Sequence, residues 1–174
     1  MKMRGYLVIA LLFFVTACFA EKDGDSTPVA NPSANPFQEH AIKIFTEYKD
    51  AKVAYLLLSS SGYANNGQYF VLDTGSQAIF YAAKAGEKEL SLNPALTEAK
   101  RAEFLSAMQE CTSLESLQSK IYDGVQYRFV RFAKVAGIVS EVQNLTMNNP
   151  ELVQGAVAHQ KLVKSFLSLV TPLH

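Results

Sequence analysis

Residues Val53–Ala83 read VAYLLLSSSGYANNGQYFVLDTGSQAIFYAA, which is three apolar runs separated by two polar turn signals. The runs are Val53–Ser59, Gln68–Leu72 and Ala78–Ala83, and their aromatic, β-branched and leucine residues suit strands. The turn signals are Asn65-Asn66-Gly67 and Asp73-Thr74-Gly75, whose residue types accept the backbone angles of tight turns. This part of the chain therefore predicts a three-stranded antiparallel meander.

A second pair of strands is predicted further along the chain. Val125–Ala133 and Ile138–Met147 are joined by the turn residues Ala136-Gly137. In the first of these strands Tyr127 and Phe129 alternate with Gln126 and Arg128, as a sheet with one wet and one dry face requires.

Three Asn-Pro pairs begin at Asn35, Asn93 and Asn149, and each precedes a segment of helical periodicity. Asn accepts an unpaired amide at a helix start, and Pro suits the first helical position. The first helix follows Pro36, and the others are predicted as Thr97–Glu110 and Glu151–Val170. Their expected inward stripes are Phe37, Ala41, Ile44, Phe45 and Tyr48; Ala102, Leu105 and Met108; and Leu152, Ala156, Val163, Phe166 and Val170.

The predicted order is α-βββ-α-ββ-α. Strands that come in runs, instead of alternating singly with helices, indicate an α+β fold. We therefore expect an antiparallel sheet of about five strands, with three helices packed on one of its faces.

The N-terminus has the layout of an export signal. Lys2 and Arg4 precede Tyr6–Ala17, an apolar run without a charge. Its 12 residues fall short of the roughly 20 that a membrane-spanning helix needs. A positive start, an apolar run and small residues after it are typical of a secretory signal peptide.

The residues Val15-Thr16-Ala17-Cys18 resemble the lipobox of bacterial lipoproteins. The resemblance implies removal of residues 1–17 and acylation of Cys18, for instance with palmitate, so that the mature chain is anchored in a membrane. Phe19, in place of the Asp that retains such proteins at the inner membrane, implies the outer membrane, with the domain facing the periplasm. Cleavage after Ala20, which would release a soluble periplasmic protein, is the alternative.

The residues that follow Cys18 are poor in apolar side chains and rich in turn formers, so they predict a flexible tether over residues 18–35. Residues 36–174 are then expected to form a single α+β domain. Without residues 1–17, which hold Lys2 and Arg4 and no acid, 14 basic residues face 16 acidic ones. Such a charge balance gives no field that attracts nucleic acid, so we expect no nucleic-acid partner.

Phe70–Ser76 resembles the active-site signature of aspartic proteases, in which two apolar residues precede Asp-Thr-Gly-Ser. The resemblance implies Asp73 as a catalytic residue in a dimer, because the chemistry needs two aspartates that share a proton. Val135-Ala136-Gly137 loosely matches a second motif of the retroviral-type members. The alternative, which the residues favour, is a hairpin turn that Asp73 opens and in which Gly75 takes a positive φ.

Other catalytic patterns are missing from the sequence. His40, His159 and His174 have no partner at a metal-ligand spacing, so neither a metal nor a cofactor is expected. Cys111 is expected to be a buried, unreactive thiol.

We therefore expect a non-catalytic envelope lipoprotein whose domain binds a protein partner in the periplasm, in the manner of an inhibitor or immunity protein. Tyr63, Asn65 and Asn66, in the predicted polar loop Ser59–Gly67, are the candidate partner-binding residues. The alternative is a structural or assembly accessory of an outer-membrane or cell-wall machine.

Overall fold

The computed structural model describes residues 35–61, 64–84, 86–93, 96–118 and 124–170. Over these residues the chain is α+β, with three α-helices and a six-stranded sheet. The elements, in chain order, are α1 (Pro36–Glu47), β1 (Val53–Ser61), β2 (Ala64–Asp73), β3 (Ala78–Ala83), β4 (Ser91–Leu92), α2 (Glu98–Glu110), β5 (Val125–Val135), β6 (Ile138–Asn148), the short 3₁₀-helix η1 (Pro150–Leu152) and α3 (Val157–Leu167).

The sheet has the strand order β4-β3-β2-β1-β5-β6, and all neighbours are antiparallel. This order confirms the predicted meander of β1 to β3 and the β5–β6 hairpin. The prediction of about five strands missed β4, which pairs with Tyr81 and Ala82 of β3. A two-residue strand is too short to produce an alternating pattern in the sequence.

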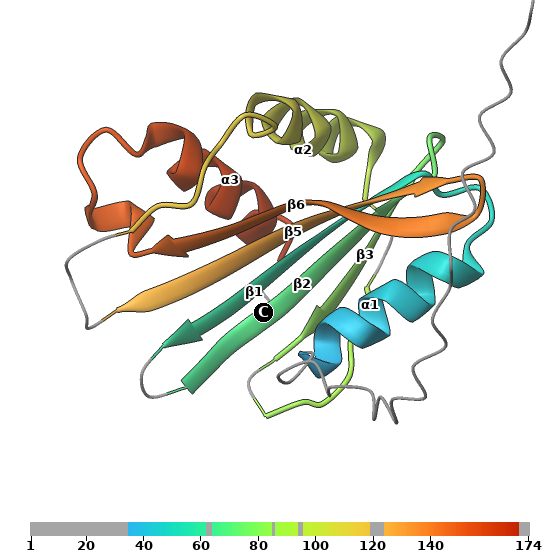
Figure 1. The fold of residues 1–174 in the computed structure, drawn as a ribbon, viewed down its shortest axis with the longest axis horizontal. Coiled ribbons are helices and arrows are strands. Elements are labelled where there is room, and N and C mark those ends of the chain that lie inside the picture. Colours follow the sequence, from blue (N-terminus) through green and yellow to red (C-terminus); the bar gives the residue numbers. More distant parts are fainter. Residues whose placement is uncertain (1–34, 62–63, 85, 94–95, 119–123, 171–174) are drawn as a thin grey trace, which may run out of the picture. The chain divides into compact units, whose positions relative to one another are not determined.

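Helices cover both faces of the sheet (Figure 1). Helices α2 and α3 lie on one face and α1 on the other, so the expectation that all helices share one face is wrong. The reason lies in β1, where the six consecutive residues Ala54–Ser59 are buried. A strand that is buried on both faces needs a helix over each of them.

Helix α1 is held at both ends by polar groups. At its start the Asn35 side chain accepts a hydrogen bond from the Phe37 amide at 2.9 Å, as predicted. At its end Lys134 Nζ donates to the Phe45 and Tyr48 carbonyls at 2.5 and 2.7 Å and lies 4.6 Å from the centre of the Phe45 ring. A cation is favourable here because unpaired carbonyls give a helix end partial negative charge. Tyr48 follows the helix and is 36% exposed, so it falls outside the predicted stripe.

Helix α2 packs through Phe104, Ala107 and Met108. Of the predicted stripe only Met108 is buried, whereas Ala102 is exposed and Leu105 is half-buried. The helix is rotated toward Phe104 because that ring buries more apolar area than the alternatives. It contacts Phe166 of α3 and Tyr55 of β1 edge-on, with ring centres 5.1 and 5.6 Å apart.

The segment after Asn149 is not one long helix. Pro150–Leu152 forms η1, and α3 begins only at Val157, because Gly155 has a φ of 84° that a right-handed helix cannot contain. Leu152 and Val170 are accordingly exposed, while Ala156, Val163 and Phe166 are buried as predicted. Asn149 has a φ of 46° and makes no side-chain cap. At the second Asn-Pro pair the cap is Thr97, which accepts from Lys100 N.

The predicted turn at Asn65-Asn66-Gly67 is wrong, because all three residues belong to β2. Gly67 pairs with Ser59 of β1, so the predicted polar loop Ser59–Gly67 consists largely of paired strands. Turn propensity was overridden here by pairing with the strongly apolar β1. None of the helices within the described ranges has the length and apolar character that spanning a bilayer requires.

Candidate binding site

Four side chains form a row across the sheet on the face that α1 covers. Gln68 of β2 pairs with Leu58 of β1, Leu58 pairs with Arg128 of β5, and Arg128 pairs with Thr146 of β6. Paired residues in an antiparallel sheet point to the same face, so these four side chains lie side by side.

The row marks the point where this face changes from apolar to polar. One row toward α1, the paired residues Phe70, Leu56 and Val130 are fully buried in the core beneath the helix. One row in the other direction, Ser60 pairs with Gln126. A hollow of about 250 Å³ lies over the polar side, lined by Asn35, Leu58, Ser59, Ser60, Gln68, Gln126, Tyr127, Arg128 and Thr146. We call these nine residues the polar pocket.

Gln68 is a deeply buried polar residue of the polar pocket, with an exposure of 4%. Its Nε2 faces the Ser59 carbonyl at 3.4 Å, which orients the amide and leaves Oε1 at its other end. No described group donates a hydrogen bond to that oxygen. A buried acceptor without a donor costs about 1–3 kcal/mol.

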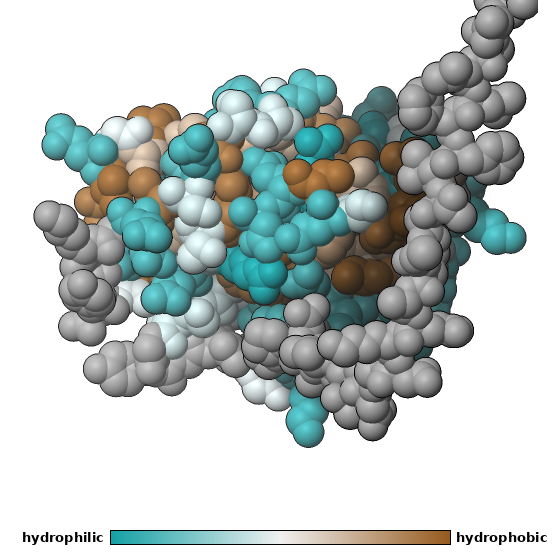
Figure 2. Space-filling model, in the orientation of Figure 1, coloured by the Kyte–Doolittle hydropathy of each residue, from teal (hydrophilic) through white to brown (hydrophobic). Residues whose placement is uncertain are grey.

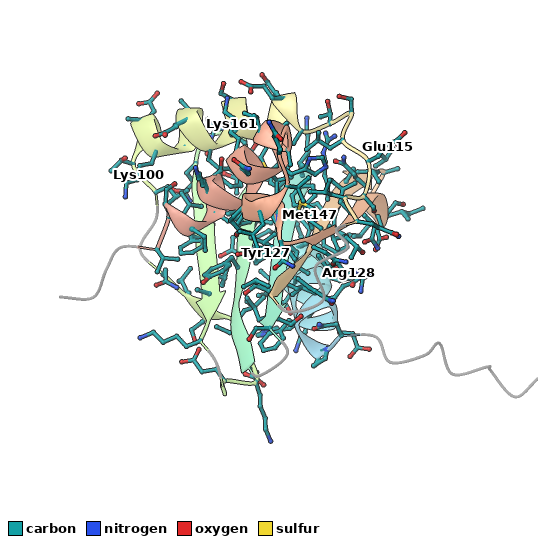
Figure 3. The ribbon with its side chains drawn as sticks, turned by 90° about the vertical axis from the view of Figure 1, so that its left-hand side faces the viewer. Lys100, Glu115, Tyr127, Arg128, Met147 and Lys161 are labelled. Carbon is teal, nitrogen blue, oxygen red and sulfur yellow. The ribbon has the colours of Figure 1, made fainter. Side chains whose placement is uncertain are left out.

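Arg128 brings a positive charge to the polar pocket. Its Nε donates to Asn144 Oδ1 at 3.2 Å, and Asn144 in turn donates to Glu141 at 2.7 Å. Neither ion pair found within the described ranges involves Arg128. Figure 3 shows that Arg128 lies on the α1 side of the sheet, whereas its neighbour Tyr127 and Met147 lie beneath α2 and α3. The terminal nitrogens of Arg128 are therefore available to an anionic group.

The N-terminal end of α1 forms one wall of the polar pocket through Asn35. Asn35 Oδ1 is used on the Phe37 amide, so only its Nδ2 is left as a donor. The first turn of the helix adds a partial positive charge from its amides. Donor groups and positive charge therefore predominate around the hollow.

The sequence-predicted site residues are distributed as follows. Tyr63 lies outside the described residues. Asn65 and Asn66 belong to β2, near the end of that strand that carries Gln68, and their side chains are not described. Sequence reasoning missed Gln68 and Thr146 as site residues, and it treated Gln126 and Arg128 only as the wet face of a strand.

The sequence contains a signal for the polar pocket, but this signal can be recognised only when the register of the strands is known. Polar residues interrupt the apolar runs of β1 and β2 at Ser59, Ser60 and Gln68. That these residues line one hollow becomes visible only when the pairing of β1 with β2 and β5 is known.

Asp73 lies at the end of β2, on the opposite face from the polar pocket. Its Oδ1 accepts from the Gly75 amide at 3.0 Å and from Arg101 Nη2 at 2.8 Å, and Arg101 also donates to the Gly75 carbonyl. Gly75 has a φ of 85°, as the turn alternative requires. Asp73 thus links the β2–β3 turn to α2, because its Oδ1 accepts hydrogen bonds from both Gly75 and Arg101.

His40, His159 and Cys111 are each hydrogen-bonded or buried within the fold. Leu90 N donates to His40 Nδ1, and His159 Nε2 lies 2.9 Å from the Glu115 carbonyl. Cys111 is buried as predicted, and burial, together with Glu110, raises the pKa of its thiol to about 11. Over the part of the chain with assigned structure, no group of three or more His, Cys, Asp or Glu residues is placed to hold a metal ion.

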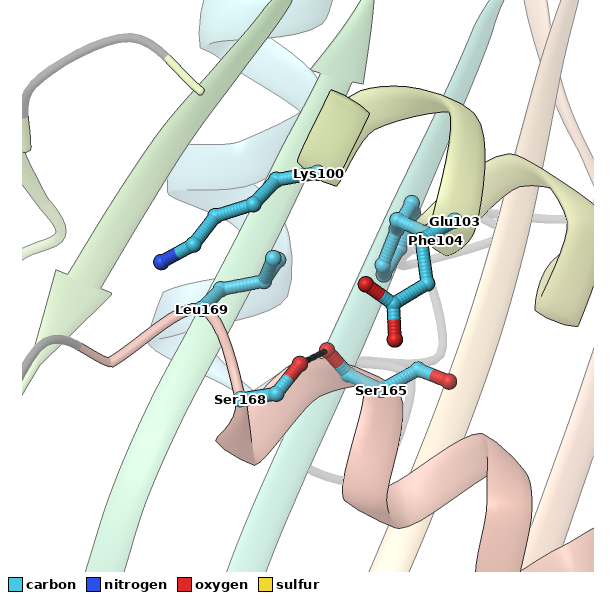
Figure 4. Close-up of a pocket in the computed structure, with 6 residues that line it drawn as sticks. All are labelled: Lys100, Glu103, Phe104, Ser165, Ser168 and Leu169. Atoms are coloured by element: carbon cyan, nitrogen blue, oxygen red, sulfur yellow. Dashed lines mark hydrogen bonds between the residues drawn. The ribbon is translucent and has the colours of Figure 1, made fainter. Parts of the chain in front are cut away.

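Two further hollows lie along the seam between α2 and α3. A groove of about 530 Å³ is lined mainly by Ser, Lys and Glu side chains, among them Lys161, which forms an exposed ion pair with Glu110. Beside it, a hollow of about 70 Å³ lies over Phe104, with Lys100 and Glu103 at its rim and Ser168 donating to the Ser165 carbonyl (Figure 4). Among the described residues that line these two hollows, none has a buried polar side-chain atom without a partner.

In comparisons with known proteins, no family model, curated protein or solved structure matches the chain.

Proposed function

We propose that this chain is a lipoprotein of the bacterial envelope that is anchored through Cys18 and binds a protein partner at the polar pocket. The domain faces the periplasm from the outer membrane and acts without catalysis, as an inhibitor or immunity protein does. The observation that supports binding at this place is the buried Gln68 Oε1, which has no donor among the described residues.

The unpaired Gln68 Oε1 makes the free polar pocket destabilising for the domain. The residues of the next row on β1 and β2, Leu56 and Phe70, are apolar and fully buried, so an apolar side chain at the position of Gln68 would remove the cost of an unpaired acceptor. A partner that donates to Gln68 recovers this free energy on binding. Arg128 and the exposed Gln126 and Thr146 then supply the polar rim that such interfaces carry.

The anchor rests on the sequence alone. Small residues directly before Cys18, after an apolar run with a positive start, support acylation of the Cys18 thiol. Radiolabelled palmitate should enter the wild-type chain and fail to enter Cys18→Ser in cells. Recovery of a cytosolic chain that retains Met1 would contradict both the anchor and the compartment.

Partner binding is tested by photo-crosslinking in intact cells. A photoreactive residue replaces Gln126, which is exposed at the polar pocket, or Lys164, which is exposed on α3 as the matched control. We expect a specific adduct from position 126 that position 164 does not give. A toxin or hydrolase in the adduct supports the inhibitor role, whereas components of an envelope machine support the accessory role. No adduct, or the same adducts at both positions, would refute binding at the polar pocket.

A further inference from the structure

We infer that the polar pocket recognises the free C-terminal carboxylate of a peptide chain, with an amide N–H of the same peptide bound beside it. This inference rests on the proposed function, because it specifies which part of a protein partner enters the polar pocket. It is carried by the hydrogen-bonding groups that remain open there and by their spacing across the sheet.

The open groups considered first can all donate a hydrogen bond. Arg128 has unused terminal N–H groups, and no hydrogen bond within the described ranges uses the Gln126 amide or the hydroxyls of Ser60 and Thr146. A guanidinium binds a carboxylate through two parallel hydrogen bonds, and neighbouring hydroxyl and amide donors can complete its coordination. An anionic group with oxygen acceptors therefore fits this side of the polar pocket.

Gln68 requires that the ligand also contain a hydrogen-bond donor. Its Oε1 is buried and has no donor, so the ligand must also present an N–H or O–H group. A simple anion without an O–H group, such as sulfate, satisfies Arg128 but leaves this oxygen without a partner. A peptide end satisfies both groups, because its last residues carry a carboxylate and an amide N–H only a few bonds apart.

The spacing fits about one amino-acid residue. Gln68 and Arg128 both flank Leu58, on β2 and β5, so their Cα atoms are two strand spacings apart, about 10 Å. Both side chains stand on the same face of the sheet as Leu58, which lines the hollow between them. A C-terminal residue with a small apolar side chain can place its carboxylate on Arg128, its side chain on Leu58 and its N–H on Gln68.

Glu141 is an acidic residue that is linked to Arg128 through the side chain of Asn144. Glu141 accepts hydrogen bonds from the side-chain amides of Gln38 at 3.1 Å and Asn144 at 2.7 Å, so it is held on the α1 side of the row. Asn144 stands between Glu141 and Arg128 and keeps the guanidinium oriented. This arrangement orients Arg128 without pairing it with a carboxylate.

The test measures peptide binding to the purified full-length chain by calorimetry. The probes are acetyl-Ala-Ala-Ala with a free carboxylate, the same peptide with a C-terminal amide, and inorganic sulfate. We expect the carboxylate form to bind at least tenfold more tightly than the amide form, and sulfate to compete only weakly. Equal affinity for the two peptides, no binding of either, or sulfate competing as well as the peptide acid would overturn the inference.

Variants locate the binding. Arg128→Gln should abolish the preference for the carboxylate form, and Gln68→Leu should weaken both forms about fivefold or more without removing the preference. Lys164→Gln, which removes an exposed cation on α3, should change neither affinity and serves as the control. Thermal unfolding of each variant shows whether it remains folded. A preference that survives in folded Arg128→Gln would refute the assignment.

The outcomes also separate this inference from the proposed function. Specific cross-links from position 126 without a preference for peptide acids would refute carboxylate recognition and leave partner binding in place. Loss of both results would refute partner binding at the polar pocket as well.

Discussion

Gly124 precedes β5 at a point where no side chain fits. A Cβ atom built on it would lie 1.7 Å from Oδ1 and 2.4 Å from Cγ of Asn149, which is itself buried. Its φ lies outside the left-handed region, so the requirement for glycine is steric and not conformational. We therefore predict that Gly124→Ala lowers the free energy of unfolding by about 2 kcal/mol, measured by urea denaturation.

The steric explanation is checked in a second background. Asn149 has a φ of 46°, which glycine adopts readily, so Asn149→Gly removes the clashing atoms without adding backbone strain. Gly124→Ala should cost clearly less in the Asn149→Gly background than alone. An equal cost in both backgrounds would mean that another contact excludes the methyl group.

Cys111 gives a pH dependence of stability at the residue scale. Burial, with a smaller contribution from Glu110, raises the pKa of its thiol from an ordinary value of 9.0 to about 11. Between these values the unfolded chain has lost a proton that the folded chain keeps, so the free energy of unfolding falls as pH rises above 9. Below pH 9 both states hold the proton and the contribution is constant.

The contribution of the thiol is isolated by comparing two chains that both carry Cys18→Ser. The stability advantage of Cys111 over Cys111→Ala should shrink between pH 8 and pH 10, measured by urea denaturation at several pH values. The comparison is needed because burial also raises the pKa of Tyr55 and Tyr69, which lowers stability in alkali in both chains. A difference that does not vary with pH would contradict the shifted thiol.

At the scale of the element, the β5–β6 hairpin carries a local strain. Val135 pairs with Ile138, so the loop has two residues, Ala136 and Gly137, with φ of 51° and 82°. Such a turn favours Asn-Gly, whereas an alanine in the left-handed region costs about 1–2 kcal/mol.

Replacing Ala136 should relieve this strain. We predict that Ala136→Asn raises the free energy of unfolding by about 0.5–1 kcal/mol, because Asn tolerates the left-handed region. Gly137→Ala, which meets no atom within 4 Å, should lower it by about 1 kcal/mol through backbone strain alone. Both values come from thermal or urea unfolding. An Ala136→Asn variant no more stable than the wild type would show that the turn is not strained.

Local features of the helices and strands were easier to predict from the sequence than the way these elements pack together. The β2–β3 turn at Asp73 and the cap at Asn35 depend on neighbouring residues, so the local sequence was sufficient. The stripe of α2, the late start of α3 and the two-sided burial of β1 depend on which distant segments pack together. The polar pocket combines residues of four strands and became visible only through their register.

At the scale of the molecule, the two edges of the sheet differ in how much unpaired strand backbone they present. One edge ends in the two-residue β4, which leaves little backbone to pair. The other is the eleven-residue β6, and hydrophilic residues dominate the surface over its middle in Figure 2. The register shifts between Arg131 and Phe132 of β5, so a bulge interrupts the β5–β6 ladder and hinders edge-to-edge association.

Only part of β6 is covered on its outer side. The Asn148 amide donates to the Leu117 carbonyl at 3.0 Å, and the Thr146 amide donates to Ser116 Oγ at 3.0 Å. Asn144 is two residues earlier on the same strand, so its amide points outward as well, and no described group accepts its hydrogen. The molecule therefore has a covered and an open half along one strand.

Hydrogen exchange measured residue by residue by NMR should show this division. We expect the slowest exchange in β1, one of the two central strands, intermediate rates at Thr146 and Asn148, and fast exchange at Asn144. Ser116→Ala removes the acceptor of Thr146 and should speed exchange there by tenfold or more, while Asn148 keeps its bond to Leu117 and its rate. If Asn144 exchanged as slowly as β1, the outer side of β6 would have to be covered along its whole length, and β6 would no longer be an edge strand.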